Sequence, residues 1–155
     1  MEMAIVLPLL VLLALGVFDF ARAIHAKNII TNMSREGANL ASRTGTTNPD
    51  IMNAIAYTAQ PLDMRNNGMI YVTVVQGNPE HGSVVPRIIS QSRWLNKSDP
   101  RSKIGSAAGE SARDLDALNL AQGETVHAVE VFYRYRSVFY TYLGLDKQLY
   151  SMSVF

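Results

Sequence analysis

The chain has 155 residues, no cysteine, and a net charge of +1 from 14 basic and 13 acidic side chains. A chain of this length holds about one domain, and the lack of cysteine excludes disulfides, thiol catalysis and zinc sites built on thiolates. The nearly balanced charge gives no electrostatic basis for binding nucleic acid.

The chain opens with an uncharged, strongly apolar run from Met3 to Phe18, preceded by one carboxylate, Glu2. As a helix the run would be about 24 Å long, slightly less than the roughly 30 Å hydrocarbon core of a bilayer. A cleavable signal peptide begins with basic residues and ends at a small-residue cleavage site, and neither feature is present here. We therefore expect a marginal, extractable membrane anchor; the alternative, a buried helix of a soluble protein, would need cover on every side.

After this run, apolar residues continue at spacings of three and four, which predicts that the same helix extends to about residue 43. The apolar stripe consists of Ala26, Ile29, Ile30, Met33, Gly37, Leu40 and Ala41. The opposite, polar face consists of Lys27, Asn28, Thr31, Ser34, Arg35, Asn39 and Ser42. We expect the stripe to pack on a globular head, with Gly45 and Pro49 ending the helix.

The elements expected in the head are a helix at residues 49–60 capped by Asn48, strands at 69–75 and 84–94, a surface loop at 96–109, a weak helix at 110–120, and strands at 125–136 and 149–155. A turn-rich connection is expected at 76–82, another turn at 145–146, and Pro86 predicts an edge position for the second strand. In the strand 125–136 we expect Glu130, Arg134 and Arg136 on the outer face.

This order of elements predicts an α+β fold in which a long, pilin-like N-terminal helix packs on a small head with a mostly antiparallel sheet. Residues 1–45 are expected to form the helix that serves as membrane anchor and filament core, and residues 46–155 the globular head.

No pattern that carries catalysis is found in the sequence. His25, His81 and His127 have no second ligand at metal spacing, and no serine has a basic or acidic partner that would make it a nucleophile. We therefore expect no enzyme activity, no cofactor and no metal. The aromatic and basic residues of 132–142 are explained more simply by a strand with one aromatic face in the core than by base stacking or surface adhesion.

Glu2 is the most specific functional signal, because a charge placed where hydrocarbon begins is costly and usually has a role. Either it is buried against neighbouring copies and pairs with a neighbour's α-amino group, which would set the register of an assembly, or it is an exposed carboxylate without a partner. Asp19 and Arg22, three residues apart, can pair on the helix surface; Arg22 can equally lie at the lipid headgroups.

Four short motifs follow one another in the first quarter of the chain. They are Glu2 itself, Leu7-Pro8 in a leucine-rich run, Asp19-Phe20-Ala21-Arg22, and Arg35-Glu36-Gly37-Ala38. As an ordered set they resemble the TadE-like pseudopilins of the tight-adherence pilus system, a branch of the type IV pili. The resemblance implies processing by a prepilin peptidase, assembly from the inner membrane by an ATPase and a platform protein, a helix bundle as filament core, and Glu2 as the first-turn glutamate that pairs with a neighbour's N-terminus.

The predicted function is that of a structural pilin or pseudopilin whose residues 3–18 wait in the inner membrane and then leave it for a bundle of like helices in an extracellular filament. The substantial head favours a minor over a major subunit. The expected partners are further copies or other pilins, the assembly machinery and, before assembly, membrane lipid. The alternative is a single-pass membrane protein whose head binds a ligand or partner in the periplasm.

Two sets of contact residues follow from this prediction. Those expected in assembly are Glu2, Pro8, Leu12, Gly16, Phe18, Asp19 and Arg22. Those expected to pack the helix on the head are Ile29, Ile30, Met33, Gly37 and Leu40.

Overall fold

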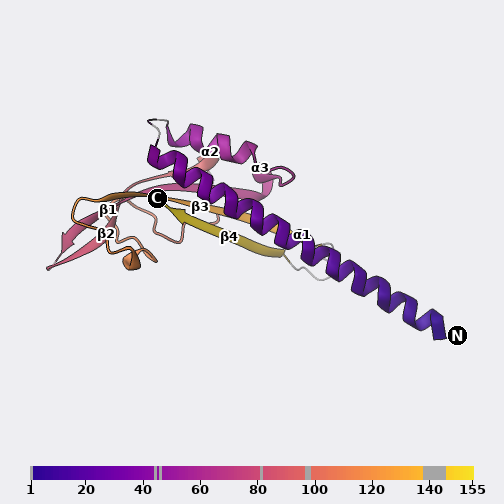
Figure 1. The fold of residues 1–155 in the computed structure, drawn as a ribbon. Coiled ribbons are helices and arrows are strands. Elements are labelled where there is room, and N and C mark those ends of the chain that lie inside the picture. The colour runs from indigo at the N-terminus through magenta and orange to yellow at the C-terminus, as the bar shows by residue number, and fades with distance from the viewer. Residues whose placement is uncertain (1, 44, 46, 81, 97–98, 138–145) are drawn as a thin grey trace.

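The structure, a computed structural model, describes all residues except 1, 44, 46, 81, 97–98 and 138–145, and of residues 2–5 and Asn96 it describes the backbone alone. In chain order the elements are α1 (Glu2–Arg43), α2 (Asn48–Tyr57), α3 (Met64–Asn67), β1 (Gly68–Glu80), β2 (Ser83–Arg93), η1 (Trp94–Asn96), η2 (Asp116–Leu118), β3 (Thr125–Arg136) and β4 (Asp146–Val154). The N-terminal part of α1 projects well beyond the sheet and the shorter helices (Figure 1). The predicted α+β fold is confirmed.

The four strands form one antiparallel sheet in the order β2-β1-β3-β4. β2 lies at an edge, as Pro86 predicted, and its outer side is partly paired by the segment that follows it in the chain. The amide of Gly109 donates to the Ile88 carbonyl at 2.7 Å, and the amide of Ala112 donates to the Pro86 carbonyl at 2.8 Å. This pairing shields part of an edge that would otherwise be open to strand addition.

The turn expected at residues 76–82 is wrong for most of its length, because β1 continues to Glu80. Residues 75–80 pair with β2 along a long hairpin, and Val75 and Gln76 also pair with β3. Pairing with neighbouring strands therefore outweighs the turn preference of Gly77, Asn78 and Pro79. Gly82, with φ +86, lies in the short connection between the two strands.

The C-terminal half of α1 packs on one face of the sheet, over β3 and β4 and beside α2. The core there includes Ala26, Ile30, Met33, Ala38 and Ala41 from α1. Ser34, expected on the polar face, is fully buried instead, and its hydroxyl lies 3.0 Å from the hydroxyls of Ser151 and of Ser153 in β4. A small polar side chain can occupy such an interface because its hydrogen bonds are satisfied there.

Residues 99–123 cover the opposite face of the sheet rather than forming only a surface loop. Ile104, Leu115 and Leu120 are buried against Val75 and Ile88. The weak helix expected at 110–120 is reduced to η2, a single 3-10 turn. The cover leaves the sheet enclosed on both faces, by α1 and α2 on one side and by this irregular segment on the other.

The expected position of Glu130 is also wrong, since its side chain is fully buried beneath this cover rather than lying outside. Its neighbours on the same face, Arg134 and Arg136, are exposed as expected. The position is tolerated because hydrogen-bond donors surround the carboxylate, as described below.

Helix α2 differs from its predicted bounds at both ends. Its N-cap is Thr47 rather than Asn48, and it ends at Tyr57. Asn48 instead donates from its side-chain amide to the Ser92 hydroxyl at 3.0 Å, which ties the start of α2 to β2. The turn expected at 145–146 falls partly outside the described residues, and Asp146 already belongs to β4.

Candidate functional site

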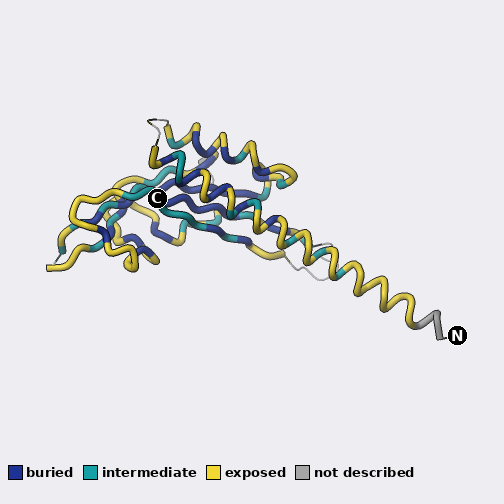
Figure 2. The backbone as a smooth tube through the Cα atoms, in the orientation of Figure 1, coloured by how far each residue is buried: buried dark blue, intermediate teal, exposed yellow. Residues whose placement is uncertain are grey.

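From residue 6 onward, where the structure describes side chains, most of the N-terminal half of α1 is exposed (Figure 2), and most large side chains on it are apolar. Its exposed large apolar side chains are Val6, Leu7, Leu9, Leu10, Val11, Leu12, Leu13, Leu15, Val17, Phe18, Phe20 and Ile24. By length and composition the helix can cross a membrane, and no residue of its most apolar 18-residue window is buried. Apolar area on this scale is unfavourable in water, so the segment requires lipid or protein around it.

Most residues expected in assembly lie on this surface where the structure describes their side chains, but Asp19 is half-buried and contacts the head. Leu12 and Phe18 are 57% and 56% exposed, and Pro8 lies inside the helix near its start. Gly16 has open space where a side chain would stand. Glu2 begins α1, but its side chain lies outside the described residues, and its pairing stays a prediction.

The residues expected to pack the helix on the head lie in the core between α1, α2 and the sheet. Ile30, Met33 and Gly37 are buried, and Ile29 and Leu40 are half-buried against the same core. Gly37 allows a close approach, because a Cβ there would lie 2.9 Å from Ile55 Cδ1 and 3.1 Å from Val129 Cγ1. One helix therefore has an uncovered apolar half and a half built into the head.

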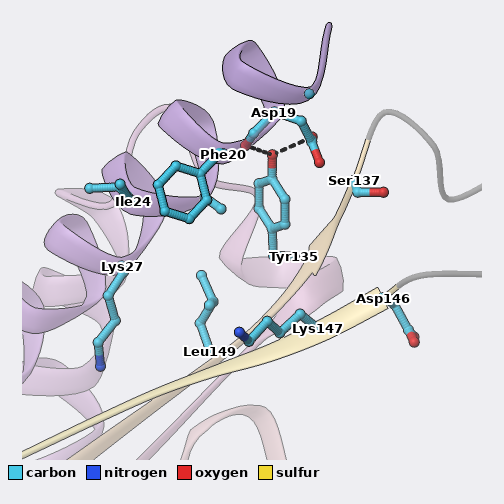
Figure 3. Close-up of a pocket in the computed structure, with 11 residues that line it drawn as sticks. Asp19, Phe20, Ile24, Lys27, Tyr135, Ser137, Asp146, Lys147 and Leu149 are labelled. Atoms are coloured by element: carbon cyan, nitrogen blue, oxygen red, sulfur yellow. Dashed lines mark hydrogen bonds between the residues drawn. The ribbon is translucent and has the colours of Figure 1, made fainter. Parts of the chain in front are cut away.

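The boundary between the two halves is marked by a contact between Asp19 and Tyr135. The Tyr135 hydroxyl donates to the Asp19 carboxylate at 2.8 Å, and the Asp19 carbonyl oxygen lies 3.1 Å from the same hydroxyl (Figure 3). Burial and the neighbouring Asp19 raise the pKa of Tyr135 to about 12. The sequence shows both residues but not this contact, whose only signal is that a core tyrosine needs a partner for its hydroxyl.

Two grooves flank α1 at this boundary. The first, about 630 Å³, has apolar walls from Phe20, Ile24 and Leu149, with Lys27 and Lys147 at its rim (Figure 3). The second, about 510 Å³, lies on the other flank of the helix and is lined by Phe18, Arg22, His25, Tyr133 and Arg136, among others. Both grooves adjoin the place where the uncovered helix leaves the head.

The Arg22 guanidinium lies over the ring of its neighbour Phe18, 5.9 Å from the ring centroid. The Asp19 carboxylate accepts from Tyr135, and its pairing with Arg22 stays a prediction. The stacked position keeps the Arg22 charge at the end of the apolar run, where headgroups would lie if the run were in a bilayer.

Glu130 is the most deeply buried ionisable side chain described, and it holds the cover of the sheet in place. Its carboxylate accepts from the Lys103 amide at 2.9 Å, from the Tyr150 hydroxyl at 3.0 Å, and from the Ser102 hydroxyl. Burial and the nearby Glu130 raise the pKa of Tyr150 well above its ordinary value. These hydrogen bonds tie residues 102–103 to β3 through the Glu130 carboxylate.

Among the described residues, no three His, Asp or Glu side chains are grouped so that they could hold a metal ion. The described features that could contact a partner are an apolar helix, two grooves beside it, and the head that packs on its other half.

Comparison with known proteins bears on the helical part of the chain. Residues 1–39 match the family model of the TadE-like protein family. No curated protein and no solved structure matches the chain. The predicted resemblance is thus confirmed for the segment that contains the four motifs, 39 of the 155 residues.

Proposed function

We propose that this chain, whose first 39 residues are similar to TadE-like proteins, is a structural subunit of a tight-adherence, type IV-like pilus. That similarity and the apolar helix fit a pilus-related protein anchored in a membrane. Assembly into a filament is the step we add. The observation that supports it most is the division of one unbroken helix into an apolar half without cover and a half built into the head.

The proposed mechanism is an exchange of surroundings for the apolar half of α1. Before assembly its side chains contact lipid, and afterwards they contact like helices of neighbouring subunits. The apolar surface stays out of water in both states, so the transfer does not incur the cost of hydration. Association of helices in an apolar medium depends on close packing, and the open space beside Gly16 offers a place for such an approach.

The second half of α1 is part of the core of the head, so the helix and the head form one unit. Ile30 and Met33 are fixed in the core between the sheet and α2, so the head must follow wherever the apolar half is placed. The head then forms the outer surface of the filament. In this proposal the chain acts structurally and not as an enzyme, and Glu2 pairs with the N-terminus of a neighbour.

The proposal extends to location and partners. The chain resides in the inner membrane before assembly and in an extracellular filament afterwards. A prepilin peptidase, an assembly ATPase, a platform protein and other pilin copies act on it or bind it. A membrane-anchored periplasmic binding module is the alternative, and such a protein would never leave the membrane.

A pair of charge substitutions tests the role of the apolar half. Leu12→Asp places a carboxylate in the middle of the uncovered run, at a cost of roughly 3 kcal/mol in a bilayer centre, and we expect it to abolish recovery of the chain in the sheared cell-surface fraction. Ile89→Asp makes the same change at a side chain of the head that is 47% exposed, and we expect recovery close to that of the unaltered chain. Equal recovery of the two variants would contradict the proposal.

A further inference from the structure

The second groove combines positive charge with a position at the end of the apolar run. Arg22 and His25 reach it from α1, and Arg136 lines it from β3. All three side chains are exposed or half-exposed rather than built into the core. Among the described residues, the ion pairs do not include Arg22, whose exposed guanidinium lies over the ring of Phe18.

The two arginines line the same groove as Tyr133. Burial raises the pKa of the Tyr133 hydroxyl, and the positive charges of Arg22 and Arg136 oppose that effect. Both guanidiniums are therefore within electrostatic reach of the same hydroxyl in the groove wall. Two carboxylates lie beside the groove. Asp63 acts on Tyr133 and accepts from the amide and side chain of Asn66 at 3.2 and 2.6 Å, and Asp19 accepts from the hydroxyl of Tyr135, which also lines the groove, at 2.8 Å.

The height of the groove along α1 matches that of a phosphate layer. The uncharged run ends at Phe18, and Arg22 follows four residues later, about 6 Å further along the helix axis. The headgroup region on each side of a bilayer is about 5–8 Å thick. If the run lies in hydrocarbon, Arg22 and the mouth of the groove are therefore level with the lipid phosphates.

We propose that this groove binds the phosphate headgroup of an anionic phospholipid while the chain is anchored in the membrane. The inference rests on the membrane-anchored state of the proposed function, but not on filament assembly. Guanidinium groups bind phosphate through paired, charge-assisted hydrogen bonds, and His25 adds a ring nitrogen. The headgroup holds the head at a defined height and must be released when the subunit leaves the bilayer.

The test measures which lipid surrounds the groove. The full chain carries no cysteine, so a single Asn67→Cys substitution at the groove allows a fluorescent donor to be attached there. The labelled chain is reconstituted in phosphatidylcholine vesicles that contain a small fraction of either phosphatidylglycerol or phosphatidylcholine bearing an acceptor on its acyl chain. Energy transfer to the two acceptors gives the relative affinity of the groove for the anionic lipid.

We expect stronger transfer to phosphatidylglycerol, and a drop of about fivefold in that relative affinity for Arg22→Gln, the loss of one surface charge. The matched control is Arg35→Gln, which removes an exposed arginine from the same helix about 20 Å from Arg22, and we expect it to leave the preference unchanged. Far-ultraviolet circular dichroism confirms that each variant keeps its helix.

Equal transfer to both lipids, or equal effects of Arg22→Gln and Arg35→Gln, would overturn the headgroup site. Loss of the preference on adding inorganic phosphate would overturn it in favour of a site for free phosphate. Failure of the unaltered chain to float with the vesicles would contradict the anchored state itself, and with it both proposals. Flotation without a lipid preference would contradict only this one.

Discussion

Tyr135 and Asp19 show how a single contact can define the geometry of the molecule. The tyrosine lies near the end of β3 and the aspartate on α1, and their hydrogen bond joins the helix to the sheet beside the exposed apolar run. Removal of the hydroxyl leaves the ring in place but frees the helix at this point. The contact therefore fixes where the projecting half of α1 begins.

The same contact gives a pH dependence. The folded pKa of Tyr135 is about 12, whereas that of an unfolded tyrosine is about 10. Between these values the unfolded chain loses the proton first, so the stability that the hydroxyl contributes is present below pH 10 and is lost as the pH rises toward 12. We expect Tyr135→Phe to be about 1 kcal/mol less stable at neutral pH and to lose less stability between pH 10 and 12.

Urea unfolding of the detergent-solubilised chain at several pH values measures both effects. Tyr57→Phe is the matched control, because that side chain is 82% exposed. Parallel stability curves for Tyr135→Phe and the unaltered chain across this pH range would show that the hydrogen bond is not a feature of the folded state.

A second prediction at the residue scale concerns Glu130, which holds the segment 102–103 on the sheet through hydrogen bonds and does not contact the helix in any hydrogen bond described. Replacing it with alanine removes three hydrogen bonds and leaves the Tyr150 hydroxyl and the Lys103 amide without an acceptor. We expect a loss of about 2–3 kcal/mol in the free energy of unfolding. Hydrogen exchange should also show faster exchange of the Lys103 amide.

The exposed Glu36 of α1 is the control for this change, and Glu36→Ala should alter neither quantity. An unchanged exchange rate at Lys103 in Glu130→Ala would mean that residues 102–103 are held on the sheet by other contacts.

At the scale of elements, α1 and β3 could be predicted well and the hairpin and cover could not. The helix bounds differ from the expected ones by a residue at the N-terminal end, and β3 has its expected bounds, because both segments carry a strong period of their own. Segment 76–80 is extended because it pairs with the start of β2 in the hairpin, and Gln76 also pairs with β3. Residues 99–123 show only a weak helical pattern, at 110–120, so nothing local shows that they cover Glu130.

Part of the candidate site could likewise be predicted from the sequence and part could not. The uncovered apolar half of α1 follows from composition alone, and so do Leu12 and Phe18 on its surface. The two grooves and the Asp19–Tyr135 contact depend on residues more than a hundred positions apart. Such pairs could not be read from one sequence, because they are created only when the helix docks on the sheet.

A substitution at Gly37 tests how closely α1 packs on α2 and the sheet. A side chain there would meet Ile55 of α2 and Val129 of β3, so Gly37→Leu must push the helix away from both. We expect a loss of about 1–3 kcal/mol from overpacking, measured by urea unfolding.

Gly16→Leu is the matched substitution, because it lies on the same helix with open space around it. We expect it to leave the stability of the isolated subunit unchanged and to reduce recovery of the chain in sheared filaments. A fully stable Gly37→Leu variant would contradict the close approach of α1 to the head.

At the scale of the whole molecule, a closed head is joined to an open helix. The sheet is enclosed on both faces, by α1 and α2 and by residues 99–123, while the large apolar side chains described in the first half of α1 are exposed (Figures 1 and 2). A head that is complete on its own can keep its structure as the helix passes from lipid to a bundle. The division therefore suits a subunit that changes surroundings without refolding.

The measurement that tests this account most directly is mass spectrometry of filaments sheared from the cell surface, with quantification of this chain in the sheared and membrane fractions. The account predicts that the chain is present in the sheared fraction in an assembly-dependent manner and is lost from it when the assembly ATPase is inactivated. Recovery of the chain in the membrane fraction alone, whether or not the ATPase is active, would contradict it and favour a membrane-anchored binding module.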